Sequence, residues 1–262
     1  MENKVTVELR NLTTGYVARS SRVLIEKNVN AALHEGEFCC LLGPNGAGKS
    51  TLLRTLSGFM PPLSGMVMLF DRPLGAYSDQ ELSRKISVVL SDRPSVTSMT
   101  VEQLVALGRS PYTGFWGRLT DRDHKVVEHS MELAAVDSFR HRLVDTLSDG
   151  ERQRVMIAKA LAQETPVIFL DEPTAFLDFP SKAEMMRILR HLAHKEGKTV
   201  MLSTHDINMA LDLADSLWLV DKRIGMETGT TAELAESGAL ARYFAAPGIS
   251  FDKAAMQFTL KK

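Results

Sequence analysis

One glycine-rich segment carries the residue types that bind phosphate. It reads Gly43-Pro44-Asn45-Gly46-Ala47-Gly48-Lys49-Ser50-Thr51 and matches the pattern G-x-x-x-x-G-K-S/T. The glycines let the backbone curl with its N–H groups pointing inward, and the positive end of the helix that follows favours an anion there. We therefore expect Lys49 to reach the β- and γ-phosphates of a nucleotide and the Ser50 hydroxyl to bind Mg²⁺.

Two carboxylates follow an apolar run at 167–170. Asp171 comes directly after this predicted strand, where it can hold the Mg²⁺ shell, and Glu172 can orient and polarise an attacking water. His205 follows a second apolar run at 199–202. This imidazole could donate a hydrogen bond to the γ-phosphate or hold the water together with Glu172. We therefore predict Glu172, His205 and Lys49 as catalytic residues.

A second anion-binding arrangement precedes the predicted helix at 151–161. Ser148 and Gly150, in Leu147-Ser148-Asp149-Gly150-Glu151, offer a hydroxyl and an accessible backbone N–H at a helix N-terminus. Alone this signal is weak, because Ser-Asp-Gly is mostly a turn or a helix cap. Tyr16 is an aromatic residue near a strand end, and two interpretations stay open: edge packing, or a ring stacked on adenine.

The elements expected to position these residues alternate between strands and helices. We predict strands at 5–9, 29–33, 38–42, 66–70, 86–90, 167–170, 199–202 and 216–220, with a polar loop between the first two. We predict helices at 49–57, 79–84, 100–107, 120–134, 151–161, 181–197, 207–214 and 231–237, with capping boxes at Thr120/Asp123 and Ser181/Glu184. Such alternation indicates a largely parallel sheet.

Composition narrows the function class. Lys+Arg 31 against Asp+Glu 32 gives a net charge of −1, which argues against a nucleic-acid binder. No apolar run is long enough to span a bilayer, and no signal segment is visible, so we expect a cytoplasmic protein. The adjacent Cys39 and Cys40 are expected in the core, not in a disulfide or metal site.

The order and spacing of these motifs resemble the ATP-binding subunit of an ABC transporter over almost the full chain. On this resemblance the glycine-rich segment is the Walker A motif, 147–151 the signature motif and 167–172 the Walker B motif. Thr174-Ala175-Phe176-Leu177-Asp178 is the D-loop, His205 the switch histidine and Tyr16 the adenine-stacking aromatic. The segment at 100–112 resembles ATPases of importers for iron–siderophore complexes, haem and vitamin B12.

The resemblance implies an α/β P-loop NTPase core with a mostly parallel sheet, an antiparallel N-terminal portion and an inserted α-helical subdomain. The single ATPase domain spans 1–262: the core at 1–90 and 148–225, the helical subdomain at 91–147 and an extension at 226–262. It further implies ATP and Mg²⁺, a homodimer in which Ser148, Asp149, Gly150 and Glu151 bind ATP in trans, and a role for Asp178 at the dimer interface. Permease subunits would dock near Ser91–Trp116 at the cytoplasmic face of the membrane, with an extracytoplasmic binding protein as an indirect partner.

Two departures from the family pattern stand out. The signature reads Leu-Ser-Asp-Gly-Glu where the family usually has Leu-Ser-Gly-Gly-Gln. Ser91, followed by Asp92, stands where the family has a glutamine that touches Mg²⁺ and the attacking water. Because a serine hydroxyl cannot reach as far as a glutamine amide, either water bridges Ser91 to the metal or Asp92 replaces the amide as an oxygen ligand.

Other functions for the same motifs are a soluble ABC ATPase of DNA repair, of ribosomes or of iron–sulfur cluster assembly, and a regulatory nucleotide-binding module with little turnover. The first two would usually carry coiled-coil or zinc insertions or two nucleotide domains. The segment at 100–112 argues against cluster assembly, while the Ser91 departure keeps the regulatory module open.

Overall fold

The structure is a computed structural model that describes residues 4–18, 21–91, 98–114, 116–244 and 246–260. The chain divides into two compact units, one made of Met1–Ala76 and Leu189–Lys262 and the other of Tyr77–Ile188. The predicted boundary of the helical subdomain at 91–147 is narrower than the second unit, and it stays a prediction. None of the helices in the described part of the chain is long and apolar enough to cross a membrane.

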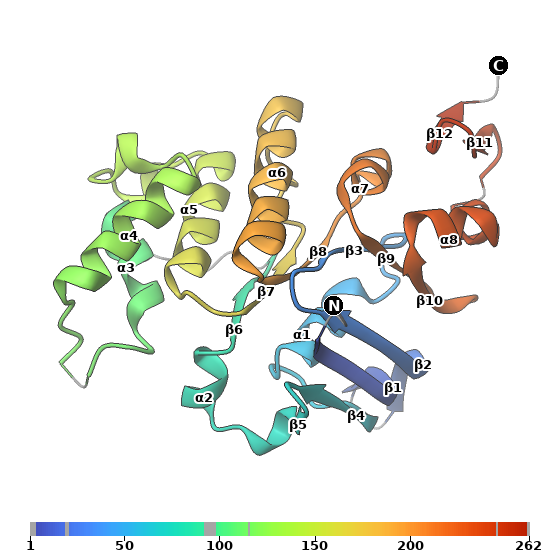
Figure 1. Cartoon of the computed structure of the whole chain (residues 1–262), viewed down its shortest axis with the longest axis horizontal. Coiled ribbons are helices and arrows are strands. Elements are labelled where there is room, and N and C mark those ends of the chain that lie inside the picture. The colour runs from blue at the N-terminus through green and yellow to red at the C-terminus, as the bar shows by residue number, and fades with distance from the viewer. Residues whose placement is uncertain (1–3, 19–20, 92–97, 115, 245, 261–262) are drawn as a thin grey trace. The chain divides into compact units, whose positions relative to one another are not determined.

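The elements alternate as the sequence predicts (Figure 1). The strands are β1 Val5–Ala18, β2 Ser21–His34, β3 Phe38–Leu42, β4 Ser64–Leu69, β5 Arg72–Pro73, β6 Ile86–Val89, β7 Val167–Asp171, β8 Thr199–Ser203, β9 Ser216–Asp221, β10 Gly225–Thr230, β11 Ile249–Asp252 and β12 Gln257–Leu260. The α-helices are α1 Lys49–Leu56, α2 Asp79–Ser83, α3 Val101–Ala106, α4 Asp121–Leu133, α5 Asp149–Ala162, α6 Phe179–Glu196, α7 Ile207–Leu213, α8 Thr231–Glu236 and α9 Ala239–Tyr243.

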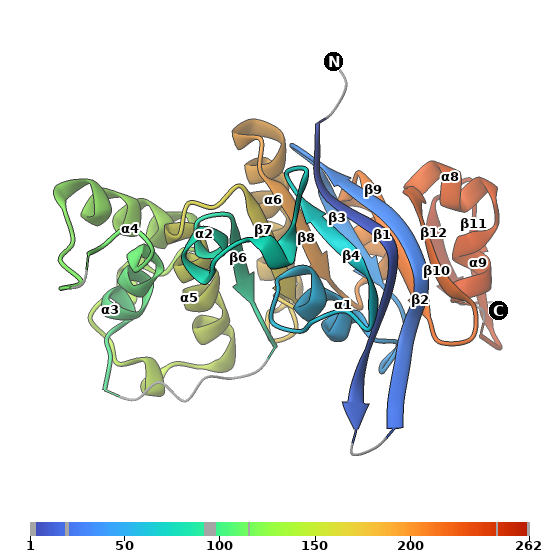
Figure 2. The same ribbon diagram turned by 90° about the horizontal axis from the view of Figure 1, so that it is seen from below.

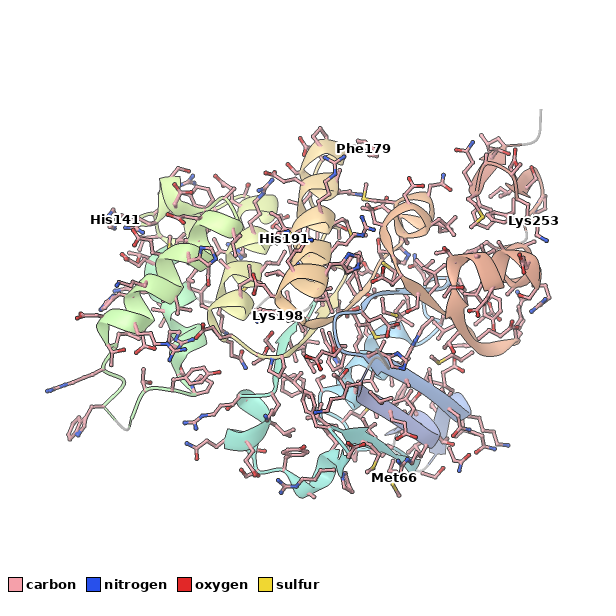
Figure 3. All side chains as sticks on the ribbon, in the orientation of Figure 1. Met66, His141, Phe179, His191, Lys198 and Lys253 are labelled. Carbon is pink, nitrogen blue, oxygen red and sulfur yellow. The ribbon has the colours of Figure 1, made fainter. Side chains whose placement is uncertain are left out.

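The first unit combines an antiparallel and a parallel sheet. In the antiparallel sheet the strand order is β2-β1-β4-β5, and Figure 2 shows β1, β2 and β4 side by side. Met66 on β4 is 46% exposed and lies on the outer surface of this sheet (Figure 3).

In the parallel part, β3 pairs with β8 on one side and with β9 on the other, and β10 runs antiparallel to β9. Every residue of β3 is buried, including the free Cys39 and Cys40, so the expectation of a core position holds. Burial raises the pKa of both thiols.

The second unit joins one parallel strand pair to a helical core. β6 pairs with β7 in parallel register, from Ile86 opposite Val167 to Val89 opposite Leu170. Helices α3, α4 and α5 pack against one another (Figure 1) around a common apolar cluster. The members of that cluster are Val101, Leu104, Val105, Val127, Met131, Ala134, Val136, Val144, Leu147, Val155, Ala158 and Ala162. The α/β fold class with its antiparallel N-terminal part and inserted helices is therefore confirmed.

Several predicted boundaries are wrong. The first two strands are much longer than 5–9 and 29–33, and residues assigned to a polar loop pair as Tyr16 with Val23 and Val17 with Arg22. A pair of antiparallel strands needs only one apolar face. Polar residues on the other face therefore interrupted the apolar pattern from which strands are predicted. The helix predicted from Ser181 begins at Phe179 instead. Asp178, not Ser181, caps it: its Oδ1 accepts a hydrogen bond from the Ser181 N–H at 3.0 Å.

The capping box predicted at Thr120 and Asp123 is confirmed, and it joins a buried ion network. The Thr120 hydroxyl and N–H donate to Asp123 Oδ2 at 2.6 and 2.9 Å, and Arg109 Nε donates to Asp123 Oδ1 at 2.8 Å. These bonds hold the pKa of Asp123 at about 2. Arg109 Nη1 also donates to the Ala162 carbonyl oxygen and to a Glu164 carboxylate oxygen, both at 2.7 Å. The network thereby ties the 3-10 turn at Leu107–Arg109, directly after α3, to α4 and to the end of α5.

Replacing Arg109 with leucine should destabilise the protein by about 3–5 kcal/mol, because the buried Asp123 carboxylate loses its cation. Urea unfolding measures this loss. Arg122→Leu is the matched control, since the Arg122 side chain is 81% exposed and lies 3.9 Å from Glu164. Equal unfolding midpoints for Arg109→Leu and Arg122→Leu would contradict the assignment of Arg109 as the link among the helices.

Candidate functional site

The phosphate loop connects the buried strand β3 to helix α1 in the first unit. A tight turn begins it, since the Ala47 N–H donates to the Pro44 carbonyl oxygen at 3.1 Å. Lys49 is only 5% exposed, and its ammonium folds back over the loop. Lys49 Nζ donates to the carbonyl oxygens of Gly43 at 2.8 Å and Pro44 at 3.4 Å. The loop therefore holds the Lys49 ammonium close to its own backbone, where a bound phosphate would also meet it.

Packing requires glycine at both ends of the loop. Gly48 has a φ of 110°, and a Cβ there would lie 1.9 Å from Ile25 Cγ2. A Cβ on Gly43 would lie 2.2 Å from the Val220 carbonyl oxygen. Gly46, with a φ of 75°, has open space around it and needs glycine for its backbone conformation alone. The loop backbone is thus fixed by the ends of β2 and β9.

The start of α1 suits an anion such as the phosphates of ATP. Gly48 is the N-cap residue and offers no side-chain cap, and the first turn contains no acidic residue. The capped helices α2, α3, α4, α5 and α8 instead satisfy their first N–H groups with Ser or Thr hydroxyls. The N–H groups of α1 and the positive end of its dipole are therefore available to phosphate oxygens. Ser50 and Thr51 lie in this first turn, as predicted.

The segment after β8 lies beside the strand that leads into the loop. The Thr204 N–H donates to the carbonyl oxygen of Leu41 at 3.2 Å, so the carboxyl ends of β8 and β3 are adjacent. His205 follows as an exposed residue, and Asp206, the N-cap residue of α7, comes directly after it. The first unit thus carries the phosphate loop and His205 at the same edge of its parallel strands, which is where open α/β sheets bind ligands. Tyr16 lies on β1, 44% exposed, where its ring can accept a stacking partner.

Ser91 and Asp171 meet in the second unit. Asp171 is the last residue of β7 and Ser91 lies two residues beyond the parallel strand β6, and Ser91 Oγ donates to Asp171 Oδ2 at 3.0 Å. Asp171 is only 1% exposed. A hydroxyl and a carboxylate are oxygen donors of the kind Mg²⁺ prefers, and Mg²⁺ usually keeps several waters and phosphate oxygens as further ligands. This pair therefore fits a Mg²⁺ site completed by nucleotide. Asp92, the alternative ligand, lies outside the described residues.

Glu172 is held at a sharp bend of the backbone. Its φ of 52° is in the left-handed region that non-glycine residues rarely adopt, and its carbonyl oxygen accepts a hydrogen bond from the Ala175 N–H at 3.2 Å. Such conformations persist where the surrounding structure imposes them, and they concentrate at functional sites. The bend turns the chain immediately after the buried Asp171.

The signature segment forms the start of α5. Ser148 is the N-cap, and its hydroxyl donates to Glu151 Oε2 at 2.9 Å while its N–H donates to the same oxygen at 2.8 Å. These bonds, followed by the pairing of Arg142 Nη1 with Glu151 Oε1 at 2.8 Å, lower the pKa of Glu151. A Cβ on Gly150 would lie 3.1 Å from the carbonyl oxygen of Phe176 in the D-loop. The signature segment and the D-loop are therefore in contact.

Sequence reasoning missed Arg142. It neutralises Glu151 next to a segment expected to bind phosphate, and so offsets the extra negative charge of the Leu-Ser-Asp-Gly-Glu signature. Arg142 precedes Glu151 by nine residues outside any α-helix, so no helical spacing links the two. Only the need to neutralise the unusual Glu151 could have pointed to a basic partner.

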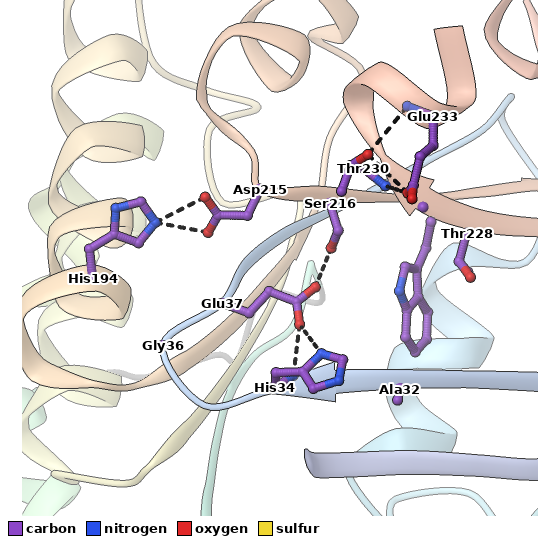
Figure 4. A pocket seen from close by; sticks show the side chains of 12 residues that line it. Ala32, His34, Gly36, Glu37, His194, Asp215, Ser216, Thr228, Thr230 and Glu233 are labelled. Atoms are coloured by element: carbon purple, nitrogen blue, oxygen red, sulfur yellow. Dashed lines mark hydrogen bonds and ion pairs between the residues drawn. The ribbon is translucent and has the colours of Figure 1, made fainter. Parts of the chain in front are cut away.

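A cavity of about 650 Å³ lies at the opposite, amino-terminal end of β3 and β9 (Figure 4). Its carboxylates are engaged in structural bonds. Asp215 Oδ2 accepts a hydrogen bond from the Phe38 N–H at 2.8 Å. The same oxygen lies 2.8 Å from His194 Nε2, with which it pairs. Glu37 Oε2 accepts the N–H of His34 at 2.7 Å, and Ser216 donates its hydroxyl to Glu37. This network fixes where the two strands begin, so we assign it a structural role.

Comparison with known proteins agrees with this geometry. The family model described as "ABC transporter" matches residues 26–175. The achromobactin transport ATP-binding protein CbrD of Dickeya dadantii is 36% identical over 90% of this chain and 86% of its own length. The iron(3+)-hydroxamate import ATP-binding protein FhuC of Bacillus subtilis is 31% identical over 91% and 87%. A dimeric ATP-binding cassette, MJ0796, with bound ADP and Pi superposes with a TM-score of 0.77 at 30% identity, covering 86% of this chain and 98% of that one.

Proposed function

We propose that this chain, which belongs to the ABC transporter family and is an ATPase, is the motor subunit of an importer for iron–siderophore or related metal chelates. Its relatives named for achromobactin transport and iron(3+)-hydroxamate import support this cargo class. Haem and cobalamin remain within the same class of cargo. One observation carries the ATPase mechanism. Helix α1 begins without a side-chain cap, and it follows a loop in which the Lys49 ammonium donates to the Gly43 carbonyl oxygen.

In the proposed reaction, water attacks the γ-phosphoryl group of ATP. Lys49 and the N–H groups of Gly43–Thr51 hold the phosphates, and Tyr16 stacks on adenine. Glu172 orients and polarises the water, while His205 donates a hydrogen bond to the γ-phosphate. Ser50, Asp171 and Ser91 would hold Mg²⁺, which supplies positive charge to the phosphate oxygens. Catalysis is then mainly positioning and electrostatics.

A second copy of the chain completes the proposed site. Ser148, Asp149, Gly150 and Glu151 at the start of α5 face the γ-phosphate bound by the partner, and Asp178 lies at the dimer interface. Ser148 donates to Glu151 in the single chain, so its hydroxyl must exchange this acceptor for a phosphate oxygen when the dimer closes. The proximity of Arg142 to Glu151 keeps the local charge compatible with that exchange.

The proposed permease contact is the exposed aromatic surface of the helical unit, on the cytoplasmic side of the membrane. Trp116 is 82% exposed, and exposed aromatics are frequent hot spots of protein interfaces. Tyr112 is held against Arg109, whose guanidinium carbon lies 4.3 Å from the ring centroid, and its hydroxyl donates to the Gln163 carbonyl oxygen at 2.9 Å. Residues 92–97 and 115 of the predicted docking segment, Ser91–Trp116, lie outside the described residues.

Uptake by cells tests the cargo. Deletion of the gene for this chain should abolish uptake of ⁵⁵Fe-labelled ferric siderophore, and the wild-type gene, but not Glu172→Gln, should restore it. Parallel assays with haem and cobalamin distinguish cargoes within the class. Normal uptake of all three chelates by the deletion strain, with ATPase activity intact in the purified protein, would reject the importer role and leave the ATPase assignment standing.

The hydroxyl of Ser91 should tune the Mg²⁺ requirement. Ser91→Ala removes the bond to Asp171 and should raise the Mg²⁺ concentration for half-maximal ATPase activity about fivefold, in line with the loss of one hydrogen bond near a charged group. Ser91→Thr keeps the hydroxyl and serves as the control. Identical Mg²⁺ titrations for Ser91→Ala and the parent would show that Ser91 plays no part in the metal site.

A further inference from the structure

One buried carboxyl group lies close behind the phosphate loop. Glu26 on β2 is 3% exposed, and its Oε1 has no hydrogen-bond partner among the residues that the structure describes. Thr14, directly opposite Glu26 on β1, also has a buried hydroxyl oxygen for which the described residues offer no partner. Since buried polar atoms are almost always bonded, and a buried carboxylate without a cation is costly, the neutral form of Glu26 is favoured here.

A second buried carboxyl group, Asp221, is the last residue of β9. Asp221 is 6% exposed, and its Oδ1 accepts hydrogen bonds from the N–H groups of Arg223 at 2.8 Å and Ile224 at 3.3 Å. Burial, and then the charge of Asp221, raise the pKa of Glu26 to about 7. Arg223 Nε lies 3.8 Å from Asp221 Oδ1, and the Arg223 side chain is 90% exposed.

Lys49 of the phosphate loop is a buried cation near this pair, and its ammonium donates to the carbonyl oxygens of Gly43 and Pro44. Other titratable groups come from α9, β10 and β2. From α9 the Tyr243 hydroxyl donates to the Gly225 carbonyl oxygen at 3.0 Å. The Tyr243 pKa is raised by burial and by the charges of Glu227 and Glu26. Arg242, also on α9, is engaged with Glu227 of β10 at 2.7 Å. Lys27, next to Glu26 on β2, is exposed on the other face.

Glu26 follows Ile25 and Asp221 follows Val220, the two residues that pack against the ends of the phosphate loop. Ile25 packs against Gly48, and Val220 packs against Gly43, at distances that exclude a Cβ on either glycine. A change of charge between the two carboxyls therefore acts on both ends of the loop through directly packed neighbours. Nucleotide phosphates add further negative charge on the other side of the same loop.

We propose that Glu26 and Asp221 form a proton-binding site behind the phosphate loop, and that this site binds its proton more tightly when nucleotide phosphates occupy the loop. The proposal rests on the assignment of Gly43–Thr51 as the nucleotide site. Two buried carboxylates beside a third negative group share a proton because they cannot all ionise at low cost. Linkage is reciprocal, so raising the pH must weaken nucleotide binding by the same factor by which nucleotide strengthens proton binding.

The affinity for nucleotide should fall as the pH rises above 7. Below pH 7 Glu26 is protonated with or without nucleotide, so pH has no effect through this group. Above pH 7 the nucleotide-free protein has lost the proton, and nucleotide must recover it. We expect the affinity for Mg-ADP to fall about tenfold from pH 6.5 to pH 8.5, within the usual range of such couplings, with proton uptake on binding near pH 7.5.

Calorimetric titration of the full chain with Mg-ADP tests this coupling. ADP avoids turnover, and measurement in two buffers with different ionisation enthalpies gives the number of protons taken up. Glu26→Gln should abolish both the extra pH dependence and the uptake. Glu8→Gln is the matched control, because Glu8 is ion-paired with Arg10 on the same antiparallel sheet. Asp221→Asn keeps an acceptor for the Arg223 and Ile224 N–H groups and should move the pH window downward.

Thermal unfolding provides a second readout if Glu26→Gln alters nucleotide binding for another reason. The folded-state pKa of Glu26 is raised, so wild-type stability falls as pH rises from about 4.5 through about 7. The melting temperature of Glu26→Gln should therefore exceed that of the wild type by about 5 °C at pH 8 and by much less at pH 5.

Equal pH dependence of Mg-ADP binding in the wild type and Glu26→Gln would overturn the proposal. If none of the proteins bound Mg-ADP at any pH, the nucleotide site itself would be wrong, and the proposal would fail with it. The two failures are therefore distinguishable in one set of titrations.

Discussion

Replacing Glu172 with glutamine should lower the ATPase rate by about 10²–10³-fold while leaving ATP affinity within about threefold of the parent. The amide preserves the shape of the side chain at the left-handed bend but cannot polarise the attacking water as a carboxylate does. Single-turnover hydrolysis of radiolabelled ATP measures the rate, and equilibrium binding of the same nucleotide measures the affinity.

Glu236→Gln is the control for this prediction, since it makes the same chemical change at an exposed position on α8. It should match the parent in both assays. Glu172→Gln with a normal single-turnover rate would show that another group activates the water, and the role proposed for Glu172 would be withdrawn. Loss of ATP binding together with hydrolysis would instead indicate that the bend at Glu172 supports the nucleotide site structurally.

Replacing Lys49 with alanine should weaken ATP binding at least about 100-fold. The Lys49 ammonium is 95% shielded from solvent and is positioned by bonds to the Gly43 and Pro44 carbonyl oxygens. A buried, charge-assisted contact to phosphate is therefore lost, and no cation replaces it. Fluorescence titration with a labelled ATP measures the change.

Lys195→Ala is the matched control, because Lys195 is exposed in the last turn of α6. This control should bind ATP like the parent. Both variants should unfold at nearly the same temperature as the parent, which separates a binding defect from misfolding. Undiminished ATP binding by Lys49→Ala would contradict the phosphate-loop assignment.

The sequence predicted the existence and order of the main elements more reliably than their boundaries. Buried strands such as β3 and β7 are continuous apolar runs, and the loop and carboxylates after them follow recognisable patterns. The long strands β1 and β2 were underestimated because only one of their faces is apolar. Strand β10 and the hairpin β11–β12 were missed because they are largely exposed, so burial leaves no strong pattern in them.

Charge relationships across the fold were the least predictable part of the site. Arg142 and Glu151 are paired by a loop conformation, and the charge of Asp221 acts on Glu26 although the two residues lie on strands of different sheets. Neither pair has a spacing that local helix or strand geometry would explain. By contrast, the family resemblance pointed to Ser91, which stands where the family has a glutamine that touches Mg²⁺, and its hydroxyl is hydrogen-bonded to Asp171.

The most direct test of the ATP-driven motor is the mass of Glu172→Gln in solution, measured by light scattering with and without Mg-ATP. We predict a monomer without nucleotide and a dimer with saturating Mg-ATP, because each copy supplies Ser148 to the nucleotide of the other. Adding Ser148→Arg to Glu172→Gln should prevent the dimer. A mass that does not change with Mg-ATP, although ATP is bound, would contradict the proposed closure of two copies around ATP.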